Sequence, residues 1–321
     1  MPALITHDMF GRELHERNPH VAGATSEERD AFLLGNQGPD PLFYSIASPS
    51  LWEFSNLGSV MHDRKPSELL VAFKQSIDIL DPEDRAIGRA YARGFLAHYT
   101  LDCLVHPLVY CQQFAFCDAG IEGLTRRAGS EVHAVIESDI DEMVLFVKRG
   151  TTVRDFFPWR EILCADEHVL DVISLMYAYV ALTVYGTAAP RVLFSKSVHN
   201  FRHIQHLFHS PHSGKRAAFV RLERLFRDRS LYDAMSHRAV ERTESVYANH
   251  ERAAWENPFT KATCTSSFWD LYDRAFTVAA ERIRIFERPN FDLAAAQALT
   301  GELNFSGEPV NALLLAVENE G

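Results

Sequence analysis

Hydrophobic and polar residues follow a helical period through most of this chain. Apolar residues recur three or four positions apart with charged residues between them, and this spacing places the apolar side chains on one face of an α-helix. We find no runs of alternating apolar and polar residues joined by hairpin turns, which would indicate strands. The pattern therefore predicts an all-α fold, a multi-helix bundle.

Proline and glycine residues mark several expected helix ends. A helix that begins at Pro66 is closed by Asp81 and Pro82, and Gly150 is the expected C-cap of another helix. The expected helices span residues 66–80, 83–109, 131–149, 161–187, 191–209, 214–228, 231–254 and 266–287.

The length of 321 residues is enough to bury a sizeable core. We expect one large helical domain, with or without a C-terminal extension. Residues 1–150 form the half that carries the candidate metal ligands, and residues 151–321 form the helical remainder. The Ser- and Thr-rich segment 260–267 precedes the last expected helix, and we do not interpret it as a domain boundary.

Two of the expected helices carry rows of metal-binding residue types. His98, Asp102 and His106 are spaced four apart, as are His133 and Glu137. Residues four apart on a helix are separated by about 400°, so each row lies along one stripe. The intervening residues are apolar, which indicates buried helices where imidazoles and carboxylates need partners. Two such rows favour a zinc-type site, although an isolated pair at this spacing is more often a hydrogen-bonded core histidine.

The N-terminal region adds three further candidates: His7, Asp40 and His62. Asp40 lies in the segment GNQGPDP, whose Gly and Pro residues indicate a turn or loop rather than a helix. Each of the three has a simpler interpretation when taken singly. Asp40 would stabilise its turn, and His62 would be a surface loop residue beside Asp63.

Taken together in chain order, these eight residues resemble the zinc-dependent phospholipase C family. That family includes secreted bacterial phospholipases C and clostridial α-toxins, and it shares a fold with single-strand-specific zinc nucleases. The segments GPDPLFY, ARGFLAHYTLDCLVHPLVY and EVHAVIESDID look most like an uncharacterised bacterial branch of the family. The resemblance covers about the first 145 residues, which hold every candidate ligand.

The resemblance implies two zinc ions close together and a third nearby. The first zinc would be held by Asp40, His62, His98 and Asp102, the second by His106, His133 and Glu137, and the third by His7 with Asp102 bridging. In secreted members the last histidine of the helix row follows the aspartate by six residues instead of four. Their third zinc also uses an N-terminal amine that is freed by signal cleavage.

The implied activity is hydrolysis of a phosphodiester by a zinc-bound hydroxide, with Asp40 as general base or as the residue that orients the hydroxide. A phospholipid is the favoured substrate. Two alternatives stay open: hydrolysis of a small non-lipid diester or nucleotide, and a metal-binding protein of the same fold without catalytic activity.

Composition and charge narrow the expected partners and location. The net charge of −11 argues against an extended nucleic-acid surface and against electrostatic docking on acidic membranes. The five cysteines form no CxxC pair, so we expect reduced, buried thiols, with Cys103 packing away from the metal row. No signal peptide is recognisable at the N-terminus, and the cytoplasm is the expected location.

Two further segments have competing interpretations. Residues 172–189 are uncharged and long enough to cross a membrane, but polar residues such as Ser174 and Thr183 favour a buried helix. A histidine-rich segment follows, with His199, His203, His206, His209 and His212. No acidic residue or cysteine is interleaved with these histidines. We therefore favour a half-exposed helix end or a wall of the substrate cleft over a separate metal site.

Overall fold

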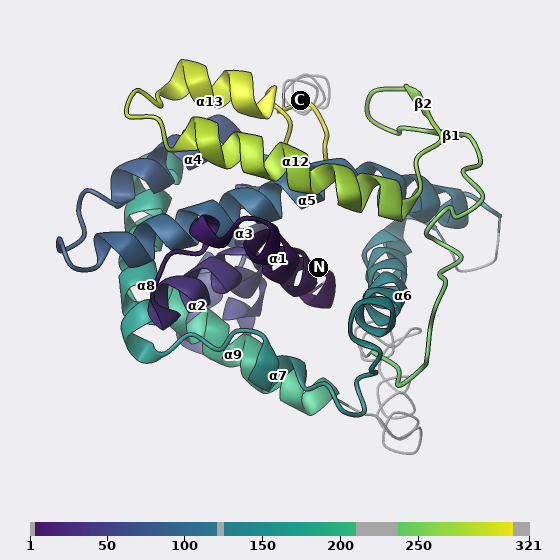
Figure 1. Ribbon diagram of the computed structural model, residues 1–321, viewed down its shortest axis with the longest axis horizontal. Helices are drawn as coiled ribbons and strands as arrows, with labels where there is room; N and C mark the ends of the chain where they lie inside the picture. The colour runs from purple at the N-terminus through teal and green to yellow at the C-terminus, as the bar shows by residue number, and fades with distance from the viewer. Residues whose placement is uncertain (1–3, 121–124, 210–236, 311–321) are drawn as a thin grey trace. The chain divides into compact units, whose positions relative to one another are not determined.

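The computed structural model describes residues 4–120, 125–209 and 237–310, and its regular structure is almost entirely helical (Figure 1). The α-helices are α1 (Leu4–Arg17), α2 (Ser26–Gly35), α3 (Leu57–Asp63), α4 (Pro66–Ser76), α5 (Arg85–Cys117), α6 (Gly129–Arg149), α7 (Pro158–Glu161), α8 (Glu167–Tyr185), α9 (Leu193–Phe208), α12 (Phe268–Phe286) and α13 (Leu293–Thr300). Short 3₁₀ helices are η1 (Pro19–Val21), η2 (Asp40–Ala47), η3 (Pro49–Phe54) and η4 (Arg126–Ala128). Within the described residues, the strands β1 (Trp255–Glu256) and β2 (Thr263–Cys264) form a small antiparallel pair. The all-α prediction is confirmed.

Several predicted helix ends agree with the structure. Helix α4 begins at Pro66, where a proline costs no helical hydrogen bond. Helix α6 ends at Arg149, and Gly150 follows in the left-handed conformation with φ 62°. Helix α5 differs, because it passes through Pro107 and continues to Cys117 instead of ending at residue 109. Leu108 and Cys117 are buried, and we attribute the continuation to this packing, which offsets the hydrogen bond lost at the proline.

The predicted helix at 231–254 is wrong for its described part, residues 237–254, which are not helical. This segment binds buried carboxylates of α6. The backbone N–H of Arg238 donates to Glu142 over 2.6 Å, and the Ser245 hydroxyl donates to Asp139 over 2.6 Å. In a helix the backbone N–H groups bond to carbonyl oxygens four residues earlier, whereas here the Arg238 N–H and the Ser245 hydroxyl bond to α6. The predicted helix at 214–228 lies outside the described residues.

The chain divides into two compact units, and each unit combines segments that are far apart in the sequence. The first unit contains Met1–Met9, Pro107–Ile162 and Arg202–Leu271; the second contains Phe10–His106, Leu163–Phe201 and Tyr272–Gly321. The arrangement of residues 1–150 and 151–321 as two halves of one domain stays a prediction.

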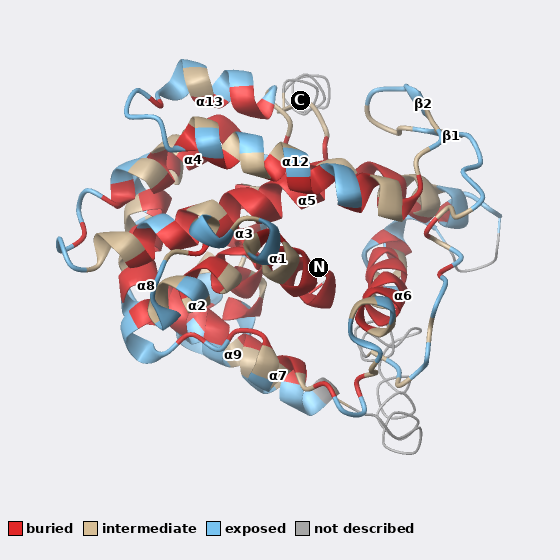
Figure 2. Ribbon diagram, in the orientation of Figure 1, coloured by how far each residue is buried: buried red, intermediate tan, exposed pale blue. Residues whose placement is uncertain are grey.

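Aromatic side chains on four helices form the core of the second unit. Helix α4 packs against α8 and α13, and α2 packs against α8. The rings of Phe73 and Phe95 lie 4.3 Å apart, and those of Tyr177 and Phe194 are stacked at 4.2 Å. Each large apolar side chain removed from water contributes about 1.5–3 kcal/mol. Buried residues are correspondingly frequent on α4, α5 and α8 (Figure 2).

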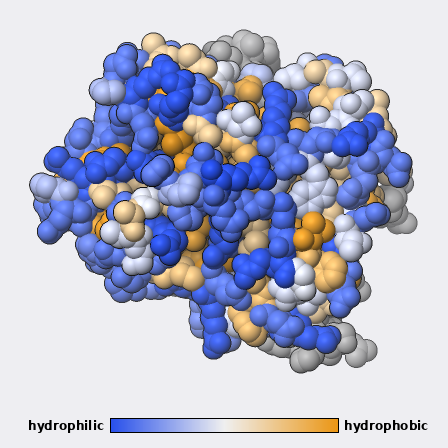
Figure 3. Space-filling view, in the orientation of Figure 1, coloured by the Kyte–Doolittle hydropathy of each residue, from blue (hydrophilic) through white to orange (hydrophobic). Residues whose placement is uncertain are grey.

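Helix α8 contains most of the uncharged segment 172–189, which by length alone could cross a membrane. Among the described residues it is the one helix long and apolar enough to cross a membrane, and 56% of its apolar window is buried inside the protein. Its packing against α4 and α2 agrees with the favoured interpretation of a buried helix. The face drawn in Figure 3 is largely hydrophilic, with hydrophobic residues in small separate patches.

Two glycines allow α2 to approach α5 very closely in the second unit. A Cβ on Gly94 would lie 2.0 Å from the carbonyl oxygen of Phe32, and a Cβ on Gly35 would lie 2.3 Å from that of Tyr91. Larger residues at these positions would force the two backbones apart. This contact brings the turn that follows α2 onto the surface of α5, beside His98.

In the first unit, a carboxylate of α6 caps the N-terminus of α1. Asp141 accepts the backbone N–H groups of Ile5 at 3.0 Å and Thr6 at 2.8 Å, and its other contacts include His237 at 2.9 Å. The first N–H groups of a helix have no partner within the helix, so a carboxylate there is favourable. The start of α1, where His7 lies, is thereby fixed to α6.

Candidate metal centre

Asp40 and His62 form a close pair in the second unit. The sequence predicts a turn or loop over the segment GNQGPDP; the structure has a turn at 36–39, and Asp40 follows it as the first residue of the 3₁₀ helix η2, only 4% exposed. Its Oδ1 lies 3.0 Å from Nε2 of His62, which comes from α3. The interpretation of His62 as a surface loop residue is therefore wrong, because the residue is helical and its side chain is 14% exposed. Two elements, η2 and α3, thus supply neighbouring oxygen and nitrogen donors, the pair that the family resemblance assigned to one zinc.

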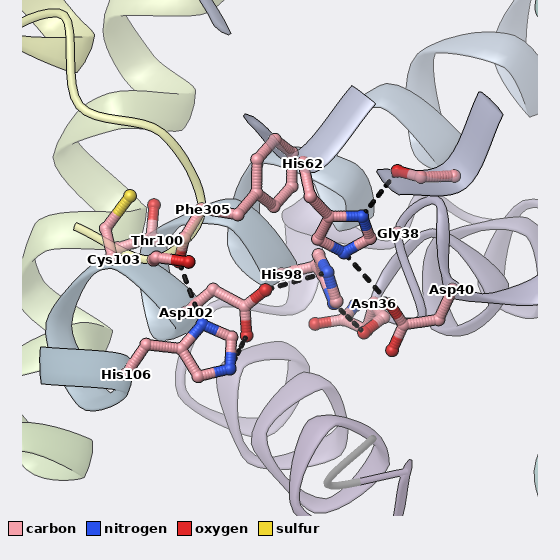
Figure 4. A network of polar contacts seen from close by, with 12 residues as sticks. Asn36, Gly38, Asp40, His62, His98, Thr100, Asp102, Cys103, His106 and Phe305 are labelled. Atoms are coloured by element: carbon pink, nitrogen blue, oxygen red, sulfur yellow. Dashed lines mark hydrogen bonds and ion pairs between the residues drawn. The ribbon is translucent and has the colours of Figure 1, made fainter. Parts of the chain in front are cut away.

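The predicted row on α5 is confirmed as one polar stripe. Nε2 of His98 lies 3.2 Å from Oδ2 of Asp102, and Nε2 of His106 lies 3.7 Å from Oδ1 of the same residue. His98 and Asp102 are buried, and His106 is partly buried. Figure 4 shows both imidazoles directed at the Asp102 carboxylate.

The three histidines of this cluster share one orientation. Nδ1 of His62 faces the carbonyl oxygen of Gly58 at 2.8 Å, and Nδ1 of His98 faces that of Asn36 at 3.1 Å. Nδ1 of His106 faces the carbonyl oxygen of Phe305 at 2.9 Å. A carbonyl oxygen only accepts, so Nδ1 carries the proton and the neutral ring has its lone pair on Nε2.

Each Nε2 in turn faces a carboxylate oxygen, which is also only an acceptor when ionised. Two acceptors repel unless the imidazole is doubly protonated or a cation lies between them. Metal-binding histidines commonly have their other ring nitrogen fixed by a carbonyl or carboxylate. The cluster therefore has the hydrogen bonding of a metal site.

Asp40, His62 and His98 are close enough to share one ion. Their ligand atoms all lie within 4.8 Å of one another. Imidazole and carboxylate donors suit zinc and several other divalent first-row metals. The residues present can thus hold a metal ion, and Asp102 is next to this group through His98.

The charge state of Asp40 is also suited to metal binding. Burial alone would raise the pKa of its carboxyl, but in the absence of metal a protonated His62 that donates to Asp40, and the positive charges of protonated His98 and His62, outweigh burial and lower the pKa. Asp40 is consequently an anion at neutral pH, as a metal ligand or a general base must be.

A pair of buried tyrosines holds the turn that leads into Asp40. The hydroxyls of Tyr91 and Tyr177 lie 2.8 Å apart, and they donate to the carbonyl oxygen of Gly38 over 3.3 Å and 3.0 Å. Sequence reasoning missed this support. Tyr177 lies within the uncharged segment 172–189, and nothing in the sequence linked it to position 38.

Among the candidate ligands of the first unit, His133 shows the same orientation. On α6, Nε2 of His133 lies 3.1 Å from Oε1 of Glu137, and its Nδ1 lies 2.8 Å from Oε1 of Gln113. His7 is buried in α1. These residues belong to a different unit from the α5 row. Their combination with it into a second and a third metal site stays a prediction.

The five cysteines are free thiols, as expected. The Cys103 thiol donates to the Asn304 carbonyl oxygen over 3.1 Å, and burial raises its pKa to about 12, which confirms packing away from the ligand row. The expectation of buried thiols is wrong for Cys164, which is exposed, and for Cys111 and Cys264, which are half-buried.

The described part of the histidine-rich segment is a half-exposed helix end, as favoured. His199 is exposed and pairs with Glu167 at 3.2 Å. His209 is half-buried, with its ring 4.4 Å from that of Trp159. Among the described residues, these histidines form no group with metal-binding geometry. His212 lies outside the described residues.

No family model matches the sequence, and no curated protein or solved structure matches it either. The structure itself establishes a mostly helical protein with buried His, Asp and Glu clusters among its helices, able to hold metal.

Proposed function

We propose that this protein is a zinc-dependent hydrolase that cleaves phosphodiester bonds and resembles phospholipase C. The observation that carries the proposal is the shared orientation of four histidines. In each ring Nδ1 faces a carbonyl or amide oxygen and Nε2 faces a carboxylate, as described above for His62, His98, His106 and His133. His168 and His199 also direct Nε2 at a carboxylate outside the cluster. The argument therefore rests on the combination in each of the four rings, an Nδ1 fixed by a neutral acceptor together with a carboxylate at Nε2, which is typical of metal-binding histidines.

The proposed ligand sets follow the order of residues in the sequence and the family resemblance. We assign the first zinc to Asp40, His62, His98 and Asp102, the second to His106, His133 and Glu137, and a weaker third to His7 with Asp102. The geometry of the Asp40, His62 and His98 group supports the first of these.

The ligand chemistry favours catalysis over a purely structural metal. Zinc held by imidazole and carboxylate, with an open position, supplies a Lewis acid and lowers the pKa of bound water to about 7. The carbonyl groups of Gly58 and Asn36 keep the imidazoles oriented. Asp40, kept ionised by its surroundings, is placed to accept a proton from an attacking water or to orient it.

A phospholipid is our proposed substrate, and a small non-lipid diester is the alternative. The net charge of −11 disfavours long nucleic acids, which need an extended basic surface. The charge does not disfavour a diester at the metal, because bound cations dominate the local field. We propose the cytoplasm as the location.

Elemental analysis of the purified protein tests metal binding. We expect two to three zinc ions per chain, and His98→Ala should lose metal and stability together because binding energy is partly folding energy. His168→Ala is the control, since His168 also directs Nε2 at a carboxylate but lies outside the cluster. Less than one metal per folded chain, even after zinc is added, would contradict the proposal.

A substrate panel tests the chemistry. The metal-loaded protein should hydrolyse phosphatidylcholine faster than bis-p-nitrophenyl phosphate or single-stranded DNA, and a chelator should abolish turnover. Preference for bis-p-nitrophenyl phosphate would favour a small-diester hydrolase. Bound metal without turnover on any of the three would favour a non-catalytic metal-binding protein.

A further inference from the structure

Residues 303–305, which we call the strap, follow α13 and lie along α5. Their three consecutive carbonyl oxygens accept hydrogen bonds from one face of that helix. The Tyr99 hydroxyl donates to Leu303 over 2.7 Å, the Cys103 thiol to Asn304 over 3.1 Å, and Nδ1 of His106 to Phe305 over 2.9 Å. The three donors lie at positions i, i+4 and i+7 of α5, so the strap follows a single helical stripe.

Phe305 also contacts two other candidate ligands. Its backbone N–H donates to the carbonyl oxygen of His62 over 3.1 Å. Its ring, only 1% exposed, lies 4.8 Å from the His62 ring and 5.8 Å from the His98 ring. Figure 4 shows Phe305 between His62 and the α5 row. One residue near the far end of the described chain therefore contacts three of the histidines of the cluster.

The strap is held in shape by its own turn. The side-chain oxygen of Asn304 accepts the backbone N–H groups of Ser306 at 2.9 Å and Glu308 at 3.0 Å. The backbone N–H of Asn304 donates to the Glu308 carbonyl oxygen over 2.9 Å, and the residue is 1% exposed. Such a closed turn presents the Phe305 carbonyl oxygen to His106 in a fixed position.

We propose that the strap is a positioning element of the metal centre, and that strap docking and metal binding are thermodynamically linked. An imidazole that loses its Nδ1 acceptor can carry its proton on either nitrogen, and a proton on Nε2 blocks that nitrogen as a ligand. The Phe305 carbonyl keeps the His106 Nε2 lone pair directed at Asp102. Linkage is reciprocal, so a strap that strengthens metal binding is itself stabilised by metal. The linkage rests on the proposed function; the positioning of His106 does not require it.

Zinc affinity, measured by competition with a chelator, tests the linkage. Phe305→Ala should undock the strap and weaken zinc binding about 10–100-fold, the usual effect of losing a residue that orients a ligand. Phe305→Leu keeps a buried apolar anchor and should bind zinc within about threefold of the wild type. Phe291→Ala is the control, since Phe291 is also buried but contacts Phe286 and Lys74 instead of the cluster.

Hydrogen exchange of the wild-type protein tests the same linkage without a substitution. Zinc should slow exchange of the backbone N–H groups of residues 302–310, including that of Phe305, and leave the β1–β2 pair unaffected. This measurement decides the question even if Phe305→Ala fails to fold. Unchanged exchange on adding zinc, or wild-type affinity in folded Phe305→Ala, would overturn the linkage.

The tautomer of His106 separates this inference from the proposed function. In the metal-free wild type, ¹⁵N resonances should show the His106 proton on Nδ1, and Phe305→Ala should shift the ring to a mixture. If the wild type binds no zinc, the proposed function and the linkage fail, while an Nδ1-protonated His106 would still support positioning by the strap. A mixture of tautomers in the metal-free wild type would overturn the positioning role.

Discussion

Gly38 lies so close to His98 that a Cβ at position 38 would be 2.2 Å from Cδ2 of the imidazole. Gly38 also has φ +52°, a conformation that residues with a Cβ rarely adopt. The turn and the ligand helix therefore fit together only because this position has no side chain, and the contact fixes the ring that also binds the Asn36 carbonyl.

Gly38→Ala should displace His98 and weaken metal binding at least about tenfold, the scale for a lost orienting contact. Its free energy of unfolding should fall by about 2–4 kcal/mol, since overpacking costs about 1–3 kcal/mol and the left-handed conformation adds about 1. Gly150→Ala is the matched control, with φ +62° and nothing within 4 Å of an added Cβ. Gly150→Ala should lower the free energy of unfolding only by the cost of the left-handed conformation, about 1 kcal/mol, and keep wild-type zinc affinity. Equal zinc affinity in the two variants would contradict the proposed contact.

Asp40→Asn should keep the fold and most of the metal but lower turnover by about two or more decades, the scale of a positioned acid–base group. The change removes the negative charge that the surroundings of Asp40 stabilise. Turnover of the metal-loaded variant on the preferred diester is the measurement, with Asp63→Asn, an exposed neighbour of His62, as control. Unchanged turnover would leave Asp40 as a structural residue at the start of η2.

Asp141→Asn should lower the free energy of unfolding by about 1–3 kcal/mol, because a buried acceptor of several hydrogen bonds loses its charge and one oxygen. Asp141 binds the first N–H groups of α1 and His237 while fully buried. Asp292→Asn tests the same substitution at the exposed N-cap of α13, where Asp292 accepts from Ala295. It should change stability by a few tenths of a kcal/mol, since asparagine caps a helix about as well. Urea denaturation of both variants gives the two changes in free energy of unfolding. Equal losses of stability would contradict a larger contribution from the buried hydrogen bonds of Asp141.

His168 should make the stability of the second unit depend on pH. Its hydrogen bond with Glu27 raises its pKa, burial opposes this, and the charge of Asp84 raises it further. A folded pKa above the unfolded value stabilises the protein below the unfolded pKa of about 6.5, and this contribution disappears as pH rises through the folded pKa.

The difference in free energy of unfolding between wild type and His168→Gln should thus be larger at about pH 5.5 than at about pH 8.5. Because the group is half exposed, the contribution should be small, roughly 0.2–1 kcal/mol as for surface ion pairs. Urea denaturation at both pH values is the measurement. A difference that grows with pH would show that the His168 pKa is lowered instead.

Local chemistry made the helices and the ligand rows predictable. Helical period identified the α-fold, and Pro66 and Gly150 marked helix ends because their effects on the backbone act within a few residues. The four-residue spacing of His98, Asp102 and His106 placed them on one stripe for the same reason. The helix predicted across 237–254 failed because long-range hydrogen bonds from Arg238 and Ser245 to α6 override local preference.

The tertiary structure alone decided which atoms face the ligands. The contacts of His106 with Phe305 and of His98 with Asn36 join residues 199 and 62 positions apart. Such pairings depend on how helices pack, and a carbonyl oxygen carries no sequence signature because every residue has one. The sequence by itself therefore determined the helices and the candidate ligands, whereas only folding determined which ring nitrogen of each histidine is directed at a carboxylate.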